Sequence, residues 1–165
     1  MSRKIYYIKL FSNLYKKFIE TLILKKNDNG SMYLLTKPIN FYNLTFSLLN
    51  NSLTQFKVLN DICVIDYPEK TDRFELSYNV LSVKYNFRVF IKSYTSAYVP
   101  SLSSLFNSAN WIERECWDMF GVFFTNHPDL RRILNMDDLG VHPMLKQYPL
   151  EDPNRVDKKD EYFGR

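Results

Sequence analysis

The feature that most limits the fold is a change of hydrophobic period near the middle of the chain. From Gln55 to Ile91, apolar residues recur at every second position, which is the pattern of β-strands with one buried face. The inward positions of the three runs are Phe56, Val58, Ile62 and Val64, then Phe74, Leu76, Tyr78 and Val80, then Tyr85, Phe87, Val89 and Ile91. We predict that the last two runs form a hairpin turning near Ser82–Asn86.

The residues before these runs follow the helical period instead. Ile5–Lys26 has apolar residues on one helix face, and Asn27-Asp28-Asn29-Gly30 interrupts it. Met32–Thr36 is a predicted short strand, and Asn40 is the predicted N-cap of a second helix. We therefore predict an α+β fold, with two N-terminal helices packed on a mostly antiparallel sheet.

Trp111–Phe120, W-I-E-R-E-C-W-D-M-F, predicts a short charged helix after the sheet. Asn110 and Glu113 have the spacing of a capping box, and Gly121 stands where a left-handed residue ends a helix. On a helical wheel Arg114, Glu115 and Asp118 lie opposite an apolar arc, where Arg114 and Asp118 can pair at i,i+4. That arc consists of Ile112, Cys116, Trp117, Met119 and Phe120. Glu113 falls inside it, so its carboxylate must be exposed, paired with an arginine or neutralised.

The sequence after Gly121 is rich in X-Pro steps and poor in apolar pairs, so we expect an extended segment without its own core. Residues 126–134 have the pattern of a short helical start, with Pro128 at the first position and Asp129 in the first turn. This segment either closes a loop or brings Arg131 or Arg132 to a carboxylate, which is that of Glu113 or one on another chain. We divide the chain into an α+β domain, residues 1–121, and a C-terminal segment, residues 122–165, lying on this domain or on a neighbouring protein.

Three kinds of chemistry have little support in the sequence. Glu115 and Asp118 share a helix face as an acid and base would, but no pocket accompanies them. Cys116 with His127 or His142 as its base is close to background for a chain of this length. Cys63, Cys116, His127 and His142 are too widely spaced for a typical zinc or iron–sulfur site. The chain also contains no G-x-G-x-x-G or Walker loop.

Composition excludes few classes of protein. A net charge of +4 and a pI near 8.9 permit nucleic-acid binding but do not require it. The long uncharged runs contain many Asn, Ser and Thr residues, so we expect no transmembrane segment. Phe and Tyr are abundant (13 and 12) and Gly is scarce (4), a bias that AT-rich codons produce, as in an organelle genome. We expect no cleaved transit peptide.

The motifs carry a resemblance to one family. A-N-W-I-E-R-E-C-W-D-M-F-G-V, then H-P-D-L-R-R-I-L and later H-P, resembles the thirty-kilodalton-type core subunit in the peripheral arm of respiratory NADH:ubiquinone oxidoreductase (complex I). The likeness covers about residues 100–150, and Cys116 falls on a variable position of the first motif. The residues that match, with an implied structural or interface role, are Glu113, Arg114, Glu115, Trp117, Asp118, Gly121, His127, Pro128, Asp129, Arg131, Arg132, His142, Pro143 and Lys146.

The resemblance implies a scaffold without catalytic, cofactor-binding or metal-binding residues of its own. FMN, iron–sulfur clusters, NADH and ubiquinone would belong to the complex, with proton pumping. The implied partners are the large hydrogenase-like subunit at the quinone site and iron–sulfur subunits, and the implied place is the matrix side of the mitochondrial inner membrane. A chloroplast relative of the enzyme and a membrane-bound hydrogenase share these motifs. The chain departs from the family at Leu145 and Gln147, which replace Arg and Asp.

Overall fold

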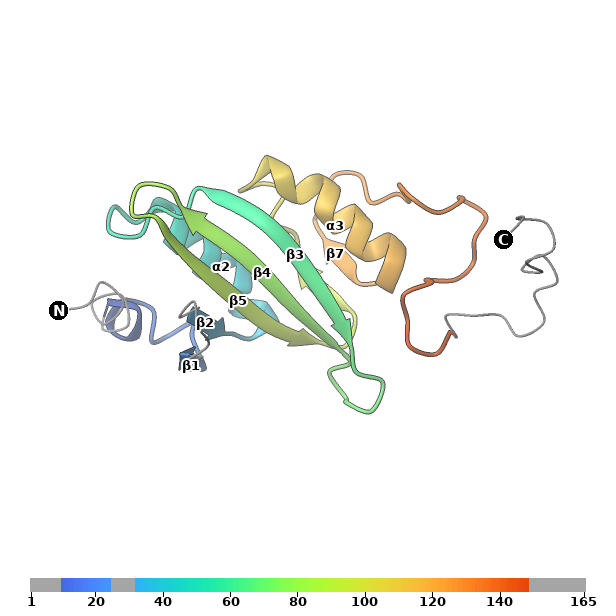
Figure 1. Ribbon diagram of the computed structural model, residues 1–165, viewed down its shortest axis with the longest axis horizontal. Helices are drawn as coiled ribbons and strands as arrows, with labels where there is room; N and C mark the ends of the chain where they lie inside the picture. The colour runs from blue at the N-terminus through green and yellow to red at the C-terminus, as the bar shows by residue number, and fades with distance from the viewer. Residues whose placement is uncertain (1–9, 25–31, 149–165) are drawn as a thin grey trace, which may run out of the picture.

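A five-stranded sheet forms the centre of the computed structural model, which describes residues 10–24 and 32–148 (Figure 1). Its strands are β1 (Thr21–Leu24), β2 (Met32–Leu35), β3 (Val58–Asp66), β4 (Phe74–Ser82) and β5 (Phe87–Thr95), in the order β1-β2-β5-β4-β3. All neighbours are antiparallel except β2 and β5, which are parallel. The predicted α+β class, its mostly antiparallel sheet and its hairpin are confirmed.

The alternation of β4 and β5 matches their burial. Leu76, Tyr78 and Val80 of β4 and Val89 and Ile91 of β5 are fully buried. In β3 the predicted register is wrong at its start, because the pairing with β4 shifts between Leu59 and Asp61. This bulge turns Leu59 into the core and leaves Val58 37% exposed, whereas Ile62 and Val64 face inward as predicted.

The first predicted helix ends earlier than its sequence pattern. Residues 10–14 are helical, and the part before residue 10 lies outside the described residues. The chain then turns, the Glu20 N–H donates to the Leu35 carbonyl at 2.8 Å, and β1 pairs with β2 where the helix was expected to continue. Strand pairing thus overrides the helical period here, because β2 offers a free edge for backbone hydrogen bonds.

The second helix is α2, Pro38–Asn50, and it begins earlier than predicted. Its N-cap is Lys37 rather than Asn40, and Pro38 occupies the first turn, where a missing N–H costs nothing. Phe41, Leu44 and Leu48 are buried against the sheet, and the Phe41 ring lies 4.2 Å from that of Tyr78 between centroids.

A third helix, α3 (Asn107–Phe120), runs alongside β3, whereas α2 lies behind the sheet in Figure 1. A small parallel sheet of β6 (Tyr98–Pro100) and β7 (Phe123–Thr125) brackets α3, so the first residues of the predicted C-terminal segment belong to the folded domain. Residues 126–148, which we call the tail, contain no helix or strand. The expectation of a helical start at residues 126–134 is therefore wrong, and the extended tail is confirmed as far as residue 148.

Candidate interface site at the charged helix

α3 is the element that positions the predicted site residues. It begins four residues earlier than predicted, after an extended Phe106, and no side chain caps it, so the capping box at Asn110 is wrong. It ends as predicted, at Gly121 in the left-handed conformation (φ 77°), whose N–H donates to the Trp117 carbonyl at 2.8 Å. A Cβ on Gly121 would lie 2.7 Å from Cδ2 of His142. This position therefore favours glycine for two reasons, the positive φ and the close approach of the imidazole.

The charged side of α3 is buried, contrary to the prediction that it faces away from the core. Glu113 and Asp118 are 0% exposed and Arg114 is 8% exposed, whereas Trp111 is 63% exposed. The tail covers this side of the helix, and polar groups of the tail and of the loop before α3 satisfy the charges. Glu115 remains exposed.

Glu113 is held by the loop before α3 and not by an arginine. Its Oε2 accepts from Ser101 Oγ at 2.5 Å and its Oε1 from the Leu102 N–H at 2.7 Å. Burial raises the pKa of Glu113 to about 7, although the two hydrogen bonds from Ser101 and Leu102 lower it. The expectation that Arg131 or Arg132 pairs with Glu113 is wrong.

His127 lies beside Glu113, with its Nε2 3.9 Å from Oε2, and its side chain is fully buried. Nδ1 of the ring accepts from the Asp129 N–H at 3.1 Å, so the proton belongs on Nε2, which donates to the Asn110 carbonyl at 3.1 Å. Both ring nitrogens are thereby used by the backbone. His127 fixes the start of the tail on α3, and Pro128, which follows it, is exposed.

Asp118 is the main anchor of the tail. Its Oδ2 accepts from the N–H groups of Ile133, Leu134 and Asn135 at 3.2, 2.9 and 3.0 Å. Its Oδ1 accepts from Arg132 Nη1 at 2.8 Å and from Asn135 Nδ2 at 3.0 Å. Burial alone would raise the pKa of Asp118, but the hydrogen bonds from Asn135, Leu134 and Ile133 outweigh it and hold the pKa well below its usual range.

The two arginines after Asp129 have different surroundings. Arg132 is largely buried and also donates to the carbonyls of Leu139 and Val141, so it braces the next turn of the tail. Arg131 is 72% exposed and pairs with Asp129 at 2.6 Å on the surface. Arg114 donates to the carbonyls of both arginines at 3.2 and 3.4 Å, so its predicted pair with Asp118 is wrong.

The later part of the tail is fixed along the end of α3. His142 Nδ1 lies 2.9 Å from the Asp118 carbonyl, and the ring packs edge-on against Trp117. Pro143 is exposed. The Lys146 N–H donates to Oδ2 of Asp66 at 2.9 Å, a link between residues 80 positions apart. Asp66 also binds Arg73 through two hydrogen bonds, at 2.6 and 2.8 Å.

This arrangement stabilises the contact between α3 and the tail and does not place Asp118, Glu115 or Cys116 for acid–base or thiol chemistry. Asp118 has every acceptor position engaged, so it cannot act as an acid or base with the exposed Glu115. Cys116 is buried, its Sγ donates to the Ile62 carbonyl at 3.6 Å, and burial raises its pKa far above the ordinary value. Among the residues that the structure describes, no three His, Cys, Asp or Glu side chains are grouped to hold a metal ion.

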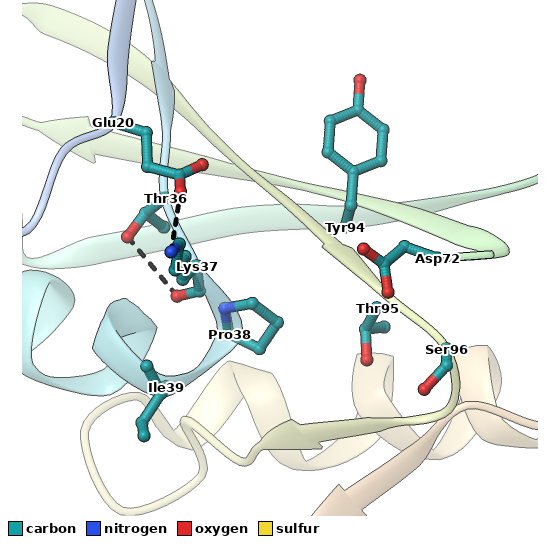
Figure 2. A pocket seen from close by; sticks show the side chains of 9 residues that line it. All are labelled: Glu20, Thr36, Lys37, Pro38, Ile39, Asp72, Tyr94, Thr95 and Ser96. Carbon is teal, nitrogen blue, oxygen red and sulfur yellow. Dashed lines mark hydrogen bonds and ion pairs between the residues drawn. The ribbon is translucent and has the colours of Figure 1, made fainter. Parts of the chain in front are cut away.

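A cavity of about 470 Å³ lies elsewhere, between the start of α2 and the end of β5 (Figure 2). Its polar lining includes Glu20, which pairs with Lys37 at 3.6 Å, and Asp72 on the opposite wall. None of the residues predicted from the motifs lines it. Within the described residues, no helix has the length and apolar character needed to cross a bilayer.

Sequence reasoning missed the groups that satisfy the buried charges. Ser101, Leu102 and Asn135 bind Glu113 and Asp118, and Asp66 holds the far end of the tail. The signal in the sequence was the isolated carboxylate of Glu113 on an apolar arc, for which exposure, an arginine partner and neutralisation were all open.

Residues 36–154 match the family model described as respiratory-chain NADH dehydrogenase, 30 Kd subunit. The chain is 72% identical over 150 residues to NADH-ubiquinone oxidoreductase subunit 9 of Acanthamoeba castellanii, covering 91% of this chain and 77% of that protein.

A mitochondrial protein of Candida albicans, named NADH dehydrogenase [ubiquinone] iron-sulfur protein 3, is 50% identical over 104 residues, covering 62% of this chain and 37% of that protein. Among solved structures, a trypsin-resistant fragment of Nqo5 superposes with a TM-score of 0.62 at 23% identity. That match covers 77% of this chain and 99% of the fragment, and it supports the fold.

Proposed function

Because this chain belongs to the family of 30 Kd subunits of respiratory-chain NADH dehydrogenase, we propose that it is a structural, non-catalytic subunit in the peripheral arm of complex I. The enzyme oxidises NADH and reduces ubiquinone. In this proposal the chain contributes shape and contacts to that reaction, and the electron-transfer groups reside in other subunits.

The buried charge network between α3 and the tail is the observation that carries this role. A segment without helix or strand is held on the domain by Asp118, Arg114 and Asp66, so its outer side has a defined shape. That side presents Leu134, Met136 and Met144, which are 60%, 75% and 55% exposed. Apolar side chains held in fixed positions on a surface favour contact with another protein.

We assign this surface to contacts with the large hydrogenase-like subunit at the quinone site and with iron–sulfur subunits of the same enzyme. FMN, iron–sulfur clusters, NADH and ubiquinone are assigned to those other subunits. The proposed location is the matrix side of the mitochondrial inner membrane. The exposed apolar groups of the tail support the contacts, and the family motifs support the assignments of cofactors and location.

The two adjacent arginines provide a test of the scaffold role. Arg132→Gln leaves the buried Asp118 carboxylate without its cationic partner, whereas Arg131→Gln changes only an exposed pair. Detergent-solubilised membranes are separated on a native gel, stained for NADH dehydrogenase activity and probed for this chain. We expect Arg132→Gln to reduce the amount of assembled enzyme and its activity in proportion, and Arg131→Gln to resemble wild type.

Two results would contradict the proposal. One is an active enzyme band that does not contain the wild-type chain. The other is normal assembly of the Arg132→Gln variant with reduced turnover per complex, which would place this chain in the reaction itself.

A further inference from the structure

Two lysines from distant parts of the chain meet at one aromatic ring. Nζ of Lys70, in the loop between β3 and β4, lies 4.1 Å from the centroid of the Tyr67 ring, and Nζ of Lys146, in the tail, lies 5.5 Å from it. The two ammonium groups are therefore at most about 10 Å from each other. Figure 1 shows this loop beside the last part of the tail.

Backbone hydrogen bonds fix the main-chain positions of Lys70 and Lys146. The Lys70 N–H donates to the Tyr67 carbonyl at 3.0 Å, and the Lys146 N–H donates to Asp66 at 2.9 Å. Lys70 also lies 5.2 Å from the ring of Tyr94. The rings orient the ammonium groups, but cation–π contacts at exposed sites contribute only about 0.5–1 kcal/mol and leave the charge in place.

The two buried carboxylates beside these lysines, Asp66 and Glu75, are each paired directly with another cation. Asp66 is bound by Arg73, and Glu75 is bound by Lys92. Glu69 and Asp72 occupy the same loop as Lys70. Within residues 10–24 and 32–148, no ion pair includes Lys70, Lys146, Glu69 or Asp72. The charges of Lys70 and Lys146 help to lower the pKa values of Glu75 and Asp66, but those carboxylates are held directly by Lys92 and Arg73, so neither Lys70 nor Lys146 has a direct carboxylate partner among the described residues.

We propose that Tyr67, Lys70 and Lys146 form a docking point for an acidic surface of another subunit of the same enzyme, which supplies a carboxylate to each lysine. This inference rests on the proposed function, because the partner is a neighbour within the complex. Separate carboxylates suit two separated ammonium groups. A single phosphate would need converging donors, and the backbone N–H groups of both lysines are already engaged.

An extended polyanion fits this site less well than a protein does. The carboxylates of Glu69 and Asp72, both exposed in the same loop, would repel the regular charge of nucleic acid or of an anionic bilayer. A folded protein partner can place single carboxylates beside the two lysines and away from Glu69 and Asp72.

Zero-length cross-linking tests the proposal on the assembled enzyme in its native membrane. A carbodiimide joins a lysine directly to a carboxylate that it already contacts, and peptide mass spectrometry identifies both residues. We expect Lys70 and Lys146 to be joined to Asp or Glu of another subunit. Lys84, which lies over a single ring at 5.3 Å (that of Tyr85), is the matched control and should give no such product.

Variants give a second, independent measurement. Lys70→Gln with Lys146→Gln leaves the backbone bond to Asp66 in place, so the tail stays attached. Loss of two exposed ion pairs should weaken retention of the chain in the enzyme by about 2- to 30-fold, measured as release from the enzyme band at lower salt, and Lys84→Gln should match wild type.

The results of the two experiments separate the docking point from the proposed function. Cross-links confined to carboxylates of this chain, or a double variant that is released at the same salt as Lys84→Gln, would overturn the docking point while leaving the proposed function intact. Absence of the wild-type chain from the enzyme band would overturn both.

Discussion

Replacing Asp118 by asparagine keeps the shape of the side chain and removes its charge, so it isolates what that charge does for the tail. The single carbonyl oxygen of an asparagine can still accept from the N–H groups of Ile133, Leu134 and Asn135. Its amide NH₂ then faces Arg132 Nη1 and Asn135 Nδ2, which are both donors. Two hydrogen bonds are lost, and a largely buried guanidinium loses its counter-charge.

The expected cost in free energy of the Asp118→Asn substitution follows from the surroundings of Arg132. Removing one partner of a buried ion pair costs about 3–5 kcal/mol. Because Arg132 keeps its bonds to the carbonyls of Leu139 and Val141, we expect the lower end, about 3 kcal/mol, for the free energy of releasing the tail. Since about 1.4 kcal/mol is a factor of ten, the tail should open roughly 100-fold more often.

Amide hydrogen exchange measures this opening directly. The N–H groups of residues 133–135 should exchange about 100-fold faster in Asp118→Asn than in wild type. Glu115→Gln makes the same chemical change on an exposed residue of the same helix and should leave their exchange unchanged. Equal exchange in the two variants would refute the reasoning, because it would mean that the Asp118 charge does not hold the tail.

Three further predictions concern neighbouring groups. Gly121→Ala should lower the free energy of unfolding by about 1–3 kcal/mol, because a positive φ is strained for alanine and the added Cβ meets the imidazole of His142. Gly140→Ala has open space around it and should leave the free energy of unfolding unchanged. Thermal unfolding compares the two variants, and equal melting temperatures would contradict the prediction. Glu113 has a pKa of about 7 in the folded protein against 4.5 for a free carboxyl, so the folded state binds its proton more tightly. The free energy of unfolding should therefore fall by up to about 3 kcal/mol as the pH rises from 4.5 to 7, and Glu113→Gln should abolish this fall. Denaturant titrations at several pH values measure the free energy of unfolding. A wild-type value that stays constant over that pH range would count against the prediction. Iodoacetamide should alkylate Cys63 in the folded chain and Cys116 only after unfolding, as seen by mass spectrometry; modification of folded Cys116 would show that it is accessible.

The central hairpin could be predicted from the sequence because its information is local. Strict alternation in β4 and β5 defines one buried face, and a one-residue slip would expose all of it. The bulge in β3 could not be predicted, since Val58 and Leu59 are equally apolar and only the pairing with β4 decides which of them faces the core. Likewise β1 forms because β2 offers an edge, although residues 21–24 continue a helical pattern.

The sequence pointed to α3 and the tail as the candidate site, but not to the groups that pair there. Glu113, Asp118, His127 and Arg132 lie at the contact between α3 and the tail, and the carboxylate of Glu113 was predicted to be exposed, paired with an arginine or neutralised. The partner turned out to be a serine hydroxyl and a backbone N–H of the preceding loop. Backbone groups carry no sequence signature, so local rules such as i,i+4 pairing could not identify the bonds made by Arg114 and Asp118.

Each group that anchors the tail through α3 or β3 comes earlier in the chain than the residues that it holds: Arg114 and Asp118 precede residues 131–135, and Asp66 precedes Lys146. A chain emerges from the ribosome N-terminus first, so the surface that receives the tail can fold before the tail is made. Linking Asp66 to Lys146 then closes only a short free loop, because the residues between them are already ordered. The tail is accordingly the last part to become ordered and the first to detach, and its anchors govern how long the finished fold persists more than how quickly it forms.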